Sequence, residues 1–118
     1  MSISPQAIVN IAVTAAEEKK AVDITVLDIS EVSIIADYFI ICSGRSGVQV
    51  QAIIENIQEK LKAQGIPALR REGFREGNWV LLDYGDVIAH VFQGPERQFY
   101  NLERLWGDAQ VVGVPVNI

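Results

Sequence analysis

The chain has 118 residues, of which 49% are hydrophobic and 21% are charged, a composition typical of one packed globular domain and not of a disordered chain. Ten basic against fifteen acidic residues give a net charge of −5, which disfavours binding to a phosphate backbone and favours a basic protein as partner. One cysteine, Cys42, and one histidine, His90, exclude an internal disulfide and a zinc cluster, so we expect no metal and no cofactor.

No apolar run approaches the roughly 20 residues that a membrane-spanning helix needs. The N-terminus also lacks a basic segment followed by an apolar one, the pattern of a secretory signal. We therefore expect a cytoplasmic protein without a membrane partner. An organellar location stays open, because a transit peptide is removed from a mature protein.

The first third of the chain predicts one helix and two strands. Ser4 at a cap position and Pro5 in the first turn begin a helix to about Ala21. Its apolar residues recur at helical spacing: Ile8, Ile11, Ala12, Ala15 and Ala16. The β-branched segment Val22–Ile29 and the unbroken apolar run Tyr38–Cys42 predict strands, the second of them fully buried.

The clearest predicted element is the next helix. Ser46 and Gln49 fit a capping box, and Gly65 with Pro67 ends the helix. One apolar stripe follows its length: Val50, Ile53, Ile54, Ile57 and Leu61.

The following segment predicts a hairpin. A possible short strand, Ile66–Arg70, precedes a charged, glycine-bearing stretch, Arg70–Asn78, which we expect to be a loop or an irregular approach to a strand. The strands Asn78–Tyr84 and Val87–Gln93 are joined by two residues, Gly85-Asp86. Glycine at the first of two turn positions fits a type II′ turn.

A last helix is expected to begin at Gly94-Pro95-Glu96 and to end at Gly107. Its apolar residues are Phe99, Leu102, Leu105 and Trp106. The order of elements predicts an α/β fold: a single domain over residues 1–118, with a mixed β-sheet flanked by helices. The core spans about residues 4–109, and residues 110–118 form a C-terminal tail.

Alternation along the hairpin separates two faces. One face is expected to be core and carries Val80, Leu82, Tyr84, Val87, Ala89 and Val91. The other carries Trp79, Leu81, Asp83, Ile88, His90 and Phe92. Aromatic and aliphatic side chains beside a carboxylate and an imidazole are typical of a recognition patch. Core packing against a helix is an equally good interpretation of this second face.

Candidate chemistry is weak elsewhere. Asp83 and Asp86 are three residues apart, so they do not share a strand face as metal-binding carboxylates require, and Asp86 suits a turn. The segment Ser43–Gly47 resembles a phosphate cradle before a helix but lacks a P-loop ending, so capping explains it better. Cys42 is expected to be an inert buried thiol, and His90 a hydrogen-bonded structural residue. We therefore predict no catalytic residue.

Several blocks of the chain resemble the ribosomal silencing factor family, RsfS, also called Iojap-like, in the same order from about Ser4 to Ala109. The blocks are Ala36–Phe39, Ser43-Gly44, Trp79–Val87, His90–Phe92 and Arg97–Trp106. The segment Arg45–Val48 departs from the Thr-Ser-Asp-Arg type of sequence that is frequent in the family.

The resemblance implies a nucleotidyltransferase-like fold without that superfamily's active site, and a homodimer when free. It also implies binding to the large ribosomal subunit through ribosomal protein L-fourteen, which prevents the subunits from joining and represses translation when nutrients are short. By position in the matching blocks, the residues expected to bind the partner are Trp79, Leu81, Asp83, Tyr84, Asp86, His90, Phe92 and Arg97. The alternatives are a nucleotidyltransferase-like enzyme that binds nucleotide and metal, and a module that only associates with itself.

Overall fold

The structure is a computed structural model that describes residues 3–94 and 110–114. In chain order its elements are α1 (Pro5–Glu18), β1 (Val22–Asp28), β2 (Tyr38–Gly44), α2 (Gly47–Ala63), β3 (Arg70–Glu72), β4 (Trp79–Asp83), β5 (Val87–Gln93) and β6 (Gln110–Val111). The predicted mixed-sheet α/β fold is confirmed. The predicted last helix, from Gly94 to Gly107, lies almost entirely outside the described residues.

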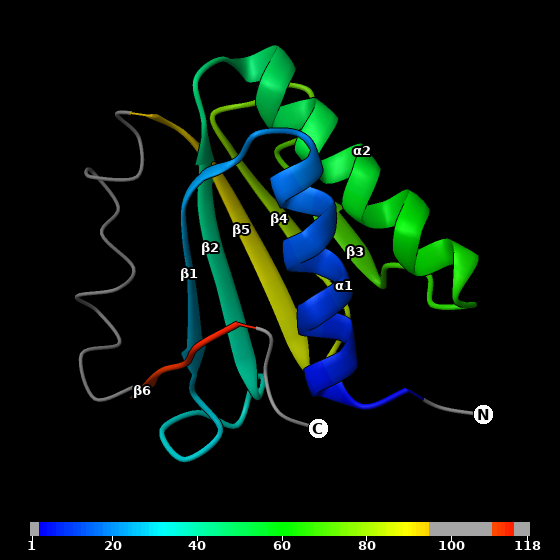
Figure 1. Cartoon of the computed structure of the whole chain (residues 1–118), viewed down its shortest axis with the longest axis vertical. Helices are drawn as coiled ribbons and strands as arrows, with labels where there is room; N and C mark the ends of the chain where they lie inside the picture. Colours follow the sequence, from blue (N-terminus) through cyan, green and yellow to red (C-terminus); the bar gives the residue numbers. More distant parts are fainter. Residues whose placement is uncertain (1–2, 95–109, 115–118) are drawn as a thin grey trace.

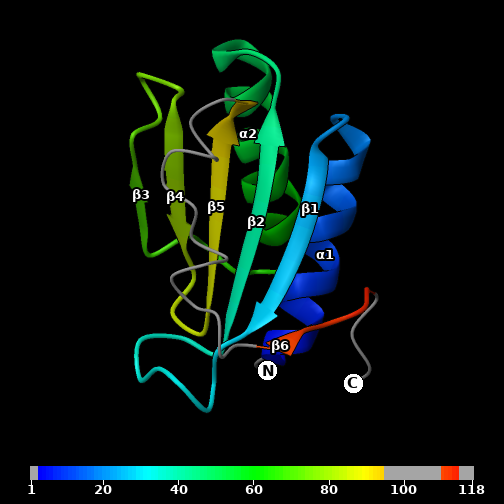
Figure 2. The same ribbon diagram turned by 90° about the vertical axis from the view of Figure 1, so that its left-hand side faces the viewer.

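The strands form one sheet in the order β3-β4-β5-β2-β1-β6 (Figures 1 and 2). The central pair, β2 and β5, is parallel, and the other pairs are antiparallel. Every residue of β2 is buried, as predicted from its unbroken apolar run. This strand therefore contributes side chains to a packed layer on each face of the sheet.

Both described helices lie on the same face of the sheet (Figure 1). Together with that face they form the main core, to which β2 contributes Tyr38, Ile40 and Cys42. The alternate β2 residues Phe39 and Ile41 point the other way, into a second, smaller cluster. The sheet is thus packed on both faces, with the helices on only one of them.

Helix α1 ends at Glu18, three residues before the predicted end at Ala21. The reason is local: Lys20 adopts a left-handed conformation with φ of 66°, and the Ala21 amide donates to the Ala16 carbonyl at 3.1 Å. These features are the terminating geometry that closes a helix by satisfying its last carbonyls. At the other end, Ser4 Oγ accepts a hydrogen bond from the Ala7 amide at 3.2 Å, which confirms the predicted cap.

At the start of α2, one hydrogen bond of the predicted capping box is present and the reciprocal one goes to a different amide. Ser46 Oγ accepts from the Gln49 amide at 3.1 Å. Gln49 Oε1 accepts from the Arg45 amide at 2.6 Å, one residue before the position that a capping box uses. Its Nε2 donates to the Lys19 and Lys20 carbonyls, both at 3.1 Å. Gln49 therefore links the start of α2 to the turn after α1.

The position of the strand before the hairpin was predicted wrongly. Instead of Ile66–Arg70, β3 is Arg70–Glu72, within the stretch expected to be a loop or an irregular approach to a strand. It pairs antiparallel with β4, with Arg70 opposite Asp83. All three β3 residues are charged and exposed, so no apolar alternation marks the strand in the sequence. At the other edge of the sheet, two residues of the predicted tail form β6 and pair with β1.

Within residues 3–94 and 110–114, no helix has the length and apolar character needed to cross a bilayer.

Candidate functional site

The hairpin has the predicted register. Trp79 lies opposite Phe92, and Leu81 lies opposite His90. Gly85 takes a φ of +88°, a left-handed value suited to the first position of a type II′ turn. The Asp83 carboxylate accepts a hydrogen bond from the Gly85 amide at 2.7 Å and so holds the turn. The side chains of β4 and β5 therefore divide between the two faces as expected.

The predicted core face is confirmed, since all of its residues are buried in the main core beneath α1 and α2: Val80, Leu82, Tyr84, Val87, Ala89 and Val91. The second face, which was left open between recognition and packing, is packed along β5 and partly accessible along β4. Ile88, His90 and Phe92 are buried, whereas Trp79, Leu81 and Asp83 are half-buried. The accessible part of this face therefore lies on β4.

An aromatic cluster underlies the accessible part. Trp79 stacks on Phe92 with a centroid distance of 5.3 Å, and Phe39 meets the His90 ring edge-on at 4.7 Å. Trp79 Nε1 donates a hydrogen bond to His90 Nδ1 at 3.1 Å. The predicted structural role of His90 is confirmed. The indole ring is therefore held in place by a stacking contact and a hydrogen bond.

The hydrogen bond from Trp79 determines which nitrogen of the His90 imidazole carries the proton. Because Nδ1 accepts the bond, it carries no proton, and the neutral ring holds its proton on Nε2. Within the described residues, Nε2 is buried without a hydrogen-bond partner. Burial lowers the pKa of His90 to about 4 from the usual 6.5. The aromatic cluster is thus built around an uncharged histidine.

A surface pocket of about 330 Å³ opens beside Trp79 and Leu81, and is completed by Glu72 and Gly73. Gly73 has a φ of +78°, and a Cβ there would stand 2.2 Å from the Trp79 carbonyl oxygen. Only glycine allows the connection after β3 to pass so close to β4. Glu72 and Gly73 were not predicted to belong to this surface, because they lie in the stretch expected to be a loop or an irregular approach to a strand.

The other predicted partner-binding residues are dispersed. Asp83 pairs with Arg70 at 3.6 Å. Asp86 is exposed in the turn, where its carbonyl accepts from the Asp37 amide at 2.8 Å. Tyr84 points into the main core, and burial raises the pKa of its phenol to about 12. Arg97 lies outside the described residues. The seven of these residues that the structure describes therefore do not share a single surface.

His90 and Phe92 lie beneath the accessible surface. Both are buried, so the structure does not present them to a partner directly. They instead pack against Trp79 and hold it. We define the hairpin patch as the accessible side chains around the pocket, namely Glu72, Trp79 and Leu81, with Asp83 farther along β4.

The side chains considered for chemistry lie in structural positions within the described residues. In the described part of the chain, no three His, Cys, Asp or Glu side chains gather into a set able to hold a metal ion. Cys42 is buried in the main core, as predicted. Ser46 caps α2, which is the interpretation favoured for the glycine-bearing segment before that helix.

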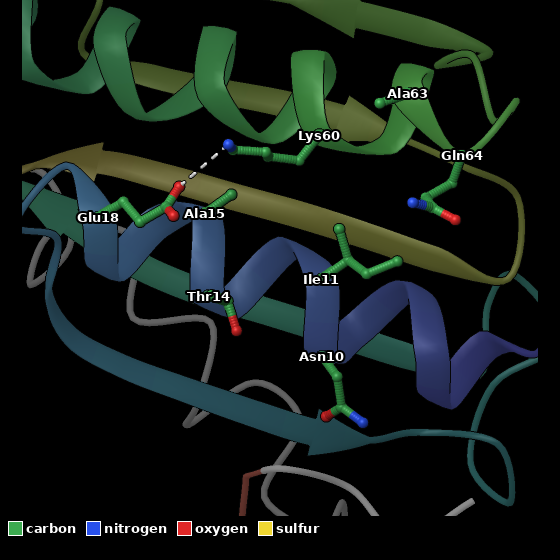
Figure 3. A pocket seen from close by; sticks show the side chains of 8 residues that line it. All are labelled: Asn10, Ile11, Thr14, Ala15, Glu18, Lys60, Ala63 and Gln64. Atoms are coloured by element: carbon green, nitrogen blue, oxygen red, sulfur yellow. Dashed lines mark ion pairs between the residues drawn. The ribbon is translucent and has the colours of Figure 1, made fainter.

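A second pocket, of about 400 Å³, lies between α1 and α2 (Figure 3). Ile11, Ala15 and Ala63 contribute apolar surface, and Glu18 faces Lys60 across it at 3.8 Å. Both charged side chains are about half exposed, so this ion pair is weak. The pocket lies on the helix-covered side of the sheet, away from the hairpin patch.

Comparison with known proteins identifies the family. The family model described as "Ribosomal silencing factor during starvation" matches residues 2–117. The chain belongs to the ribosomal silencing factor family. It is 49% identical over 107 residues to "Ribosomal silencing factor RsfS" of Bacillus subtilis, covering 91% of each chain. The predicted resemblance is confirmed.

Other similarities agree with this membership. A crystal structure of a Chromobacterium violaceum protein superimposes with a TM-score of 0.87 at 36% identity, covering 98% of this chain and 95% of that one. A mouse protein named "Mitochondrial assembly of ribosomal large subunit protein 1" is 28% identical over 101 residues, covering 83% of this chain and 44% of its own length. The similarity to this family therefore extends over nearly the whole chain.

Proposed function

We propose that this ribosomal silencing factor binds the large ribosomal subunit through ribosomal protein L-fourteen and blocks association with the small subunit, repressing translation when nutrients are limiting. Family membership, which covers residues 2–117, is the observation that carries the proposal. The name of the mouse relative points to the same subunit. The proposed site of action is the cytoplasm, where subunits join.

The hairpin patch is the proposed docking surface. Trp79 and Leu81 offer half-buried apolar surface around a pocket of about 330 Å³, and Trp79 is fixed by its contacts with His90 and Phe92. Rigid aromatic side chains in pockets are the usual energetic centre of an interface. Glu72 and Asp83 place carboxylates at the patch, where Arg70 pairs with them at 3.4 and 3.6 Å. The chain's net charge of −5, which includes both, complements a basic ribosomal protein.

The proposed mechanism is steric and needs no chemical step. A factor bound at the subunit interface occupies space that the small subunit requires, so the blocked fraction equals the occupied fraction. Repression then depends on the concentration of the factor relative to its dissociation constant and is reversed when the factor dissociates. This mechanism distinguishes the proposal from a nucleotidyltransferase-like enzyme, whose effect would depend on turnover.

We propose also that the free protein is a homodimer. Trp79 and Leu81 leave apolar surface accessible on the hairpin patch, and a second copy related by a two-fold axis is the simplest cover for it. Docking on the ribosome would then compete with self-association. Light scattering is expected to give a mass twice the 13.0 kDa of one chain, and a single-chain mass at high micromolar concentration would contradict the dimer.

Co-sedimentation with separated ribosomal subunits tests the proposed function. The protein is expected to sediment with the large subunit and to remain in the supernatant with the small one. Binding is expected to weaken as salt rises, because an acidic surface meets a basic protein. Equal binding to both subunits, or binding to neither, would contradict the proposal.

A further inference from the structure

The connection between β1 and β2 carries solvent-exposed aliphatic side chains. We call residues 29–37 the β1–β2 loop. Ile34 is 106% exposed and Ile35 is 63% exposed, and Val32 beside them is also exposed. Figures 1 and 2 show the loop, in cyan, projecting beyond the end of the sheet. Clustered large aliphatic residues in water are typical of a surface that meets a partner.

Hydrogen bonds hold the loop in shape. The Ile29 amide donates to the Asp37 carbonyl at 2.8 Å and closes its base, and the Val32 amide donates to the Ile29 carbonyl at 3.0 Å. The Asp37 amide donates to the Asp86 carbonyl of the hairpin turn at 2.8 Å. Ile29 and Ala36 are buried in the second cluster and anchor both sides. The exposed side chains are thus presented by an ordered loop, which reduces the entropy lost on binding.

The charges around the loop are acidic. The segment from Ala21 to Gly44 contains no Lys or Arg. It does contain Asp28, Glu31 and Asp37. Asp28 and Glu31, with Val32 and Gln110 of β6, line a small pocket of about 150 Å³. Two carboxylates and an amide offer acceptor oxygens to an ammonium or guanidinium group.

We propose that the β1–β2 loop is a second docking site, for a protein segment in which Lys or Arg stands beside large apolar residues. Ile34 and Ile35 contact the apolar residues, and the pocket between Asp28 and Glu31 receives the cation. The carboxylates repel nucleic acid and anionic lipid. A second copy docked by two-fold symmetry would bring the same carboxylates together, so a basic protein is the favoured occupant.

This inference rests on the proposed function, since the partner is then a basic protein of the large ribosomal subunit. The loop site is separate from the pocket beside Trp79. The loop contacts the turn at Asp86, whereas Trp79 begins β4 at the far end of that strand. Two separated contacts on one rigid domain would fix the orientation of the factor on the subunit as well as its affinity.

The test uses purified large ribosomal subunits. Ile34→Ser combined with Ile35→Ser is expected to weaken co-sedimentation about tenfold. Val48→Ser is the matched control, because Val48 is 78% exposed and lies in the first turn of α2. It is expected to bind as the unaltered protein does. Since all three side chains are exposed, none of these changes leaves a core cavity, and the unfolding midpoint is expected to stay constant.

A charge reversal tests the acidic pocket. Glu31→Lys is expected to weaken binding severalfold, whereas Glu59→Lys, an exposed position on α2 with the same change in net charge, is expected to have less effect. A photo-reactive group at position 34 is expected to cross-link to a protein segment rich in Lys and Arg. Cross-linking to ribosomal RNA or to a second copy would overturn the inference.

The outcomes separate this inference from the proposed function. If the doubly altered loop binds as well as the unaltered protein while Trp79→Ala binds weakly, the loop is not a docking site and the proposed function stands. If the unaltered protein fails to bind the large subunit, the proposed function and this inference both fall.

Discussion

We expect Trp79→Ala to weaken binding to the large ribosomal subunit by about 2–4 kcal/mol, the cost of removing a central aromatic anchor from an interface. Trp79 is half-buried, stacks on Phe92 at 5.3 Å and donates to His90 Nδ1. Its removal therefore also lowers the free energy of unfolding, by about 1–3 kcal/mol, because packing and one partly buried hydrogen bond are lost. Equilibrium binding and denaturant unfolding measure the two effects separately.

A matched control separates lost stability from lost contact. Ile57→Val deletes one methyl group from a fully buried residue of α2 and is expected to cost about 1 kcal/mol of folding stability. It leaves the hairpin patch unchanged, so binding to the large subunit should be normal. If Trp79→Ala also binds at full strength while remaining folded, the hairpin patch is not the docking surface.

We expect folding stability to fall by about 3 kcal/mol between pH 6.5 and pH 4 on account of His90. Burial lowers its pKa to about 4 in the folded protein, whereas the unfolded chain has the usual value of 6.5. Well above pH 6.5 the imidazole is neutral in both the folded and the unfolded state, so its protonation does not reduce the folding stability. As pH falls below 6.5 the unfolded state takes up the proton first, and each pH unit costs about 1.4 kcal/mol until the folded state titrates.

The variant His90→Gln isolates this effect. Glutamine does not titrate, and its amide oxygen can accept the hydrogen bond from Trp79 Nε1. Carboxylates elsewhere destabilise both proteins in acid, so the measurement is the difference between their unfolding free energies across this range. That difference should change by about 3 kcal/mol. Parallel stability curves would show that His90 is not buried as a neutral group.

The hairpin shows what periodicity can predict. Gly85-Asp86 fixes a two-residue turn, and alternation then assigns every side chain from Trp79 to Phe92 to a face, as the structure confirms. Helix α2 was similarly clear, because its cap residue and apolar stripe are local features. These elements are specified within a few residues of sequence, and the resemblance to the family supplied the function that no single motif carries.

Three features of the site depend on tertiary structure. Strand β3 has three charged residues and exists because β4 offers it a free edge, so its own sequence does not reveal it. The burial of His90 and Phe92 depends on packing in the second cluster, where Phe39 of β2 joins them. The approach of Gly73 to the Trp79 carbonyl brings Glu72 to the patch. Alternation left the burial of His90 and Phe92 open, and no local pattern indicates the pairing of β3 or the approach of Gly73.

Subunit joining tests the central claim most directly. Large subunits are first incubated with the protein, small subunits are added, and the joined ribosome is followed by light scattering while occupancy is measured in parallel. The account predicts that joining falls in proportion to the occupied large subunits, and that Trp79→Ala at the same concentration blocks far less. Normal joining by large subunits that are saturated with the protein would contradict it.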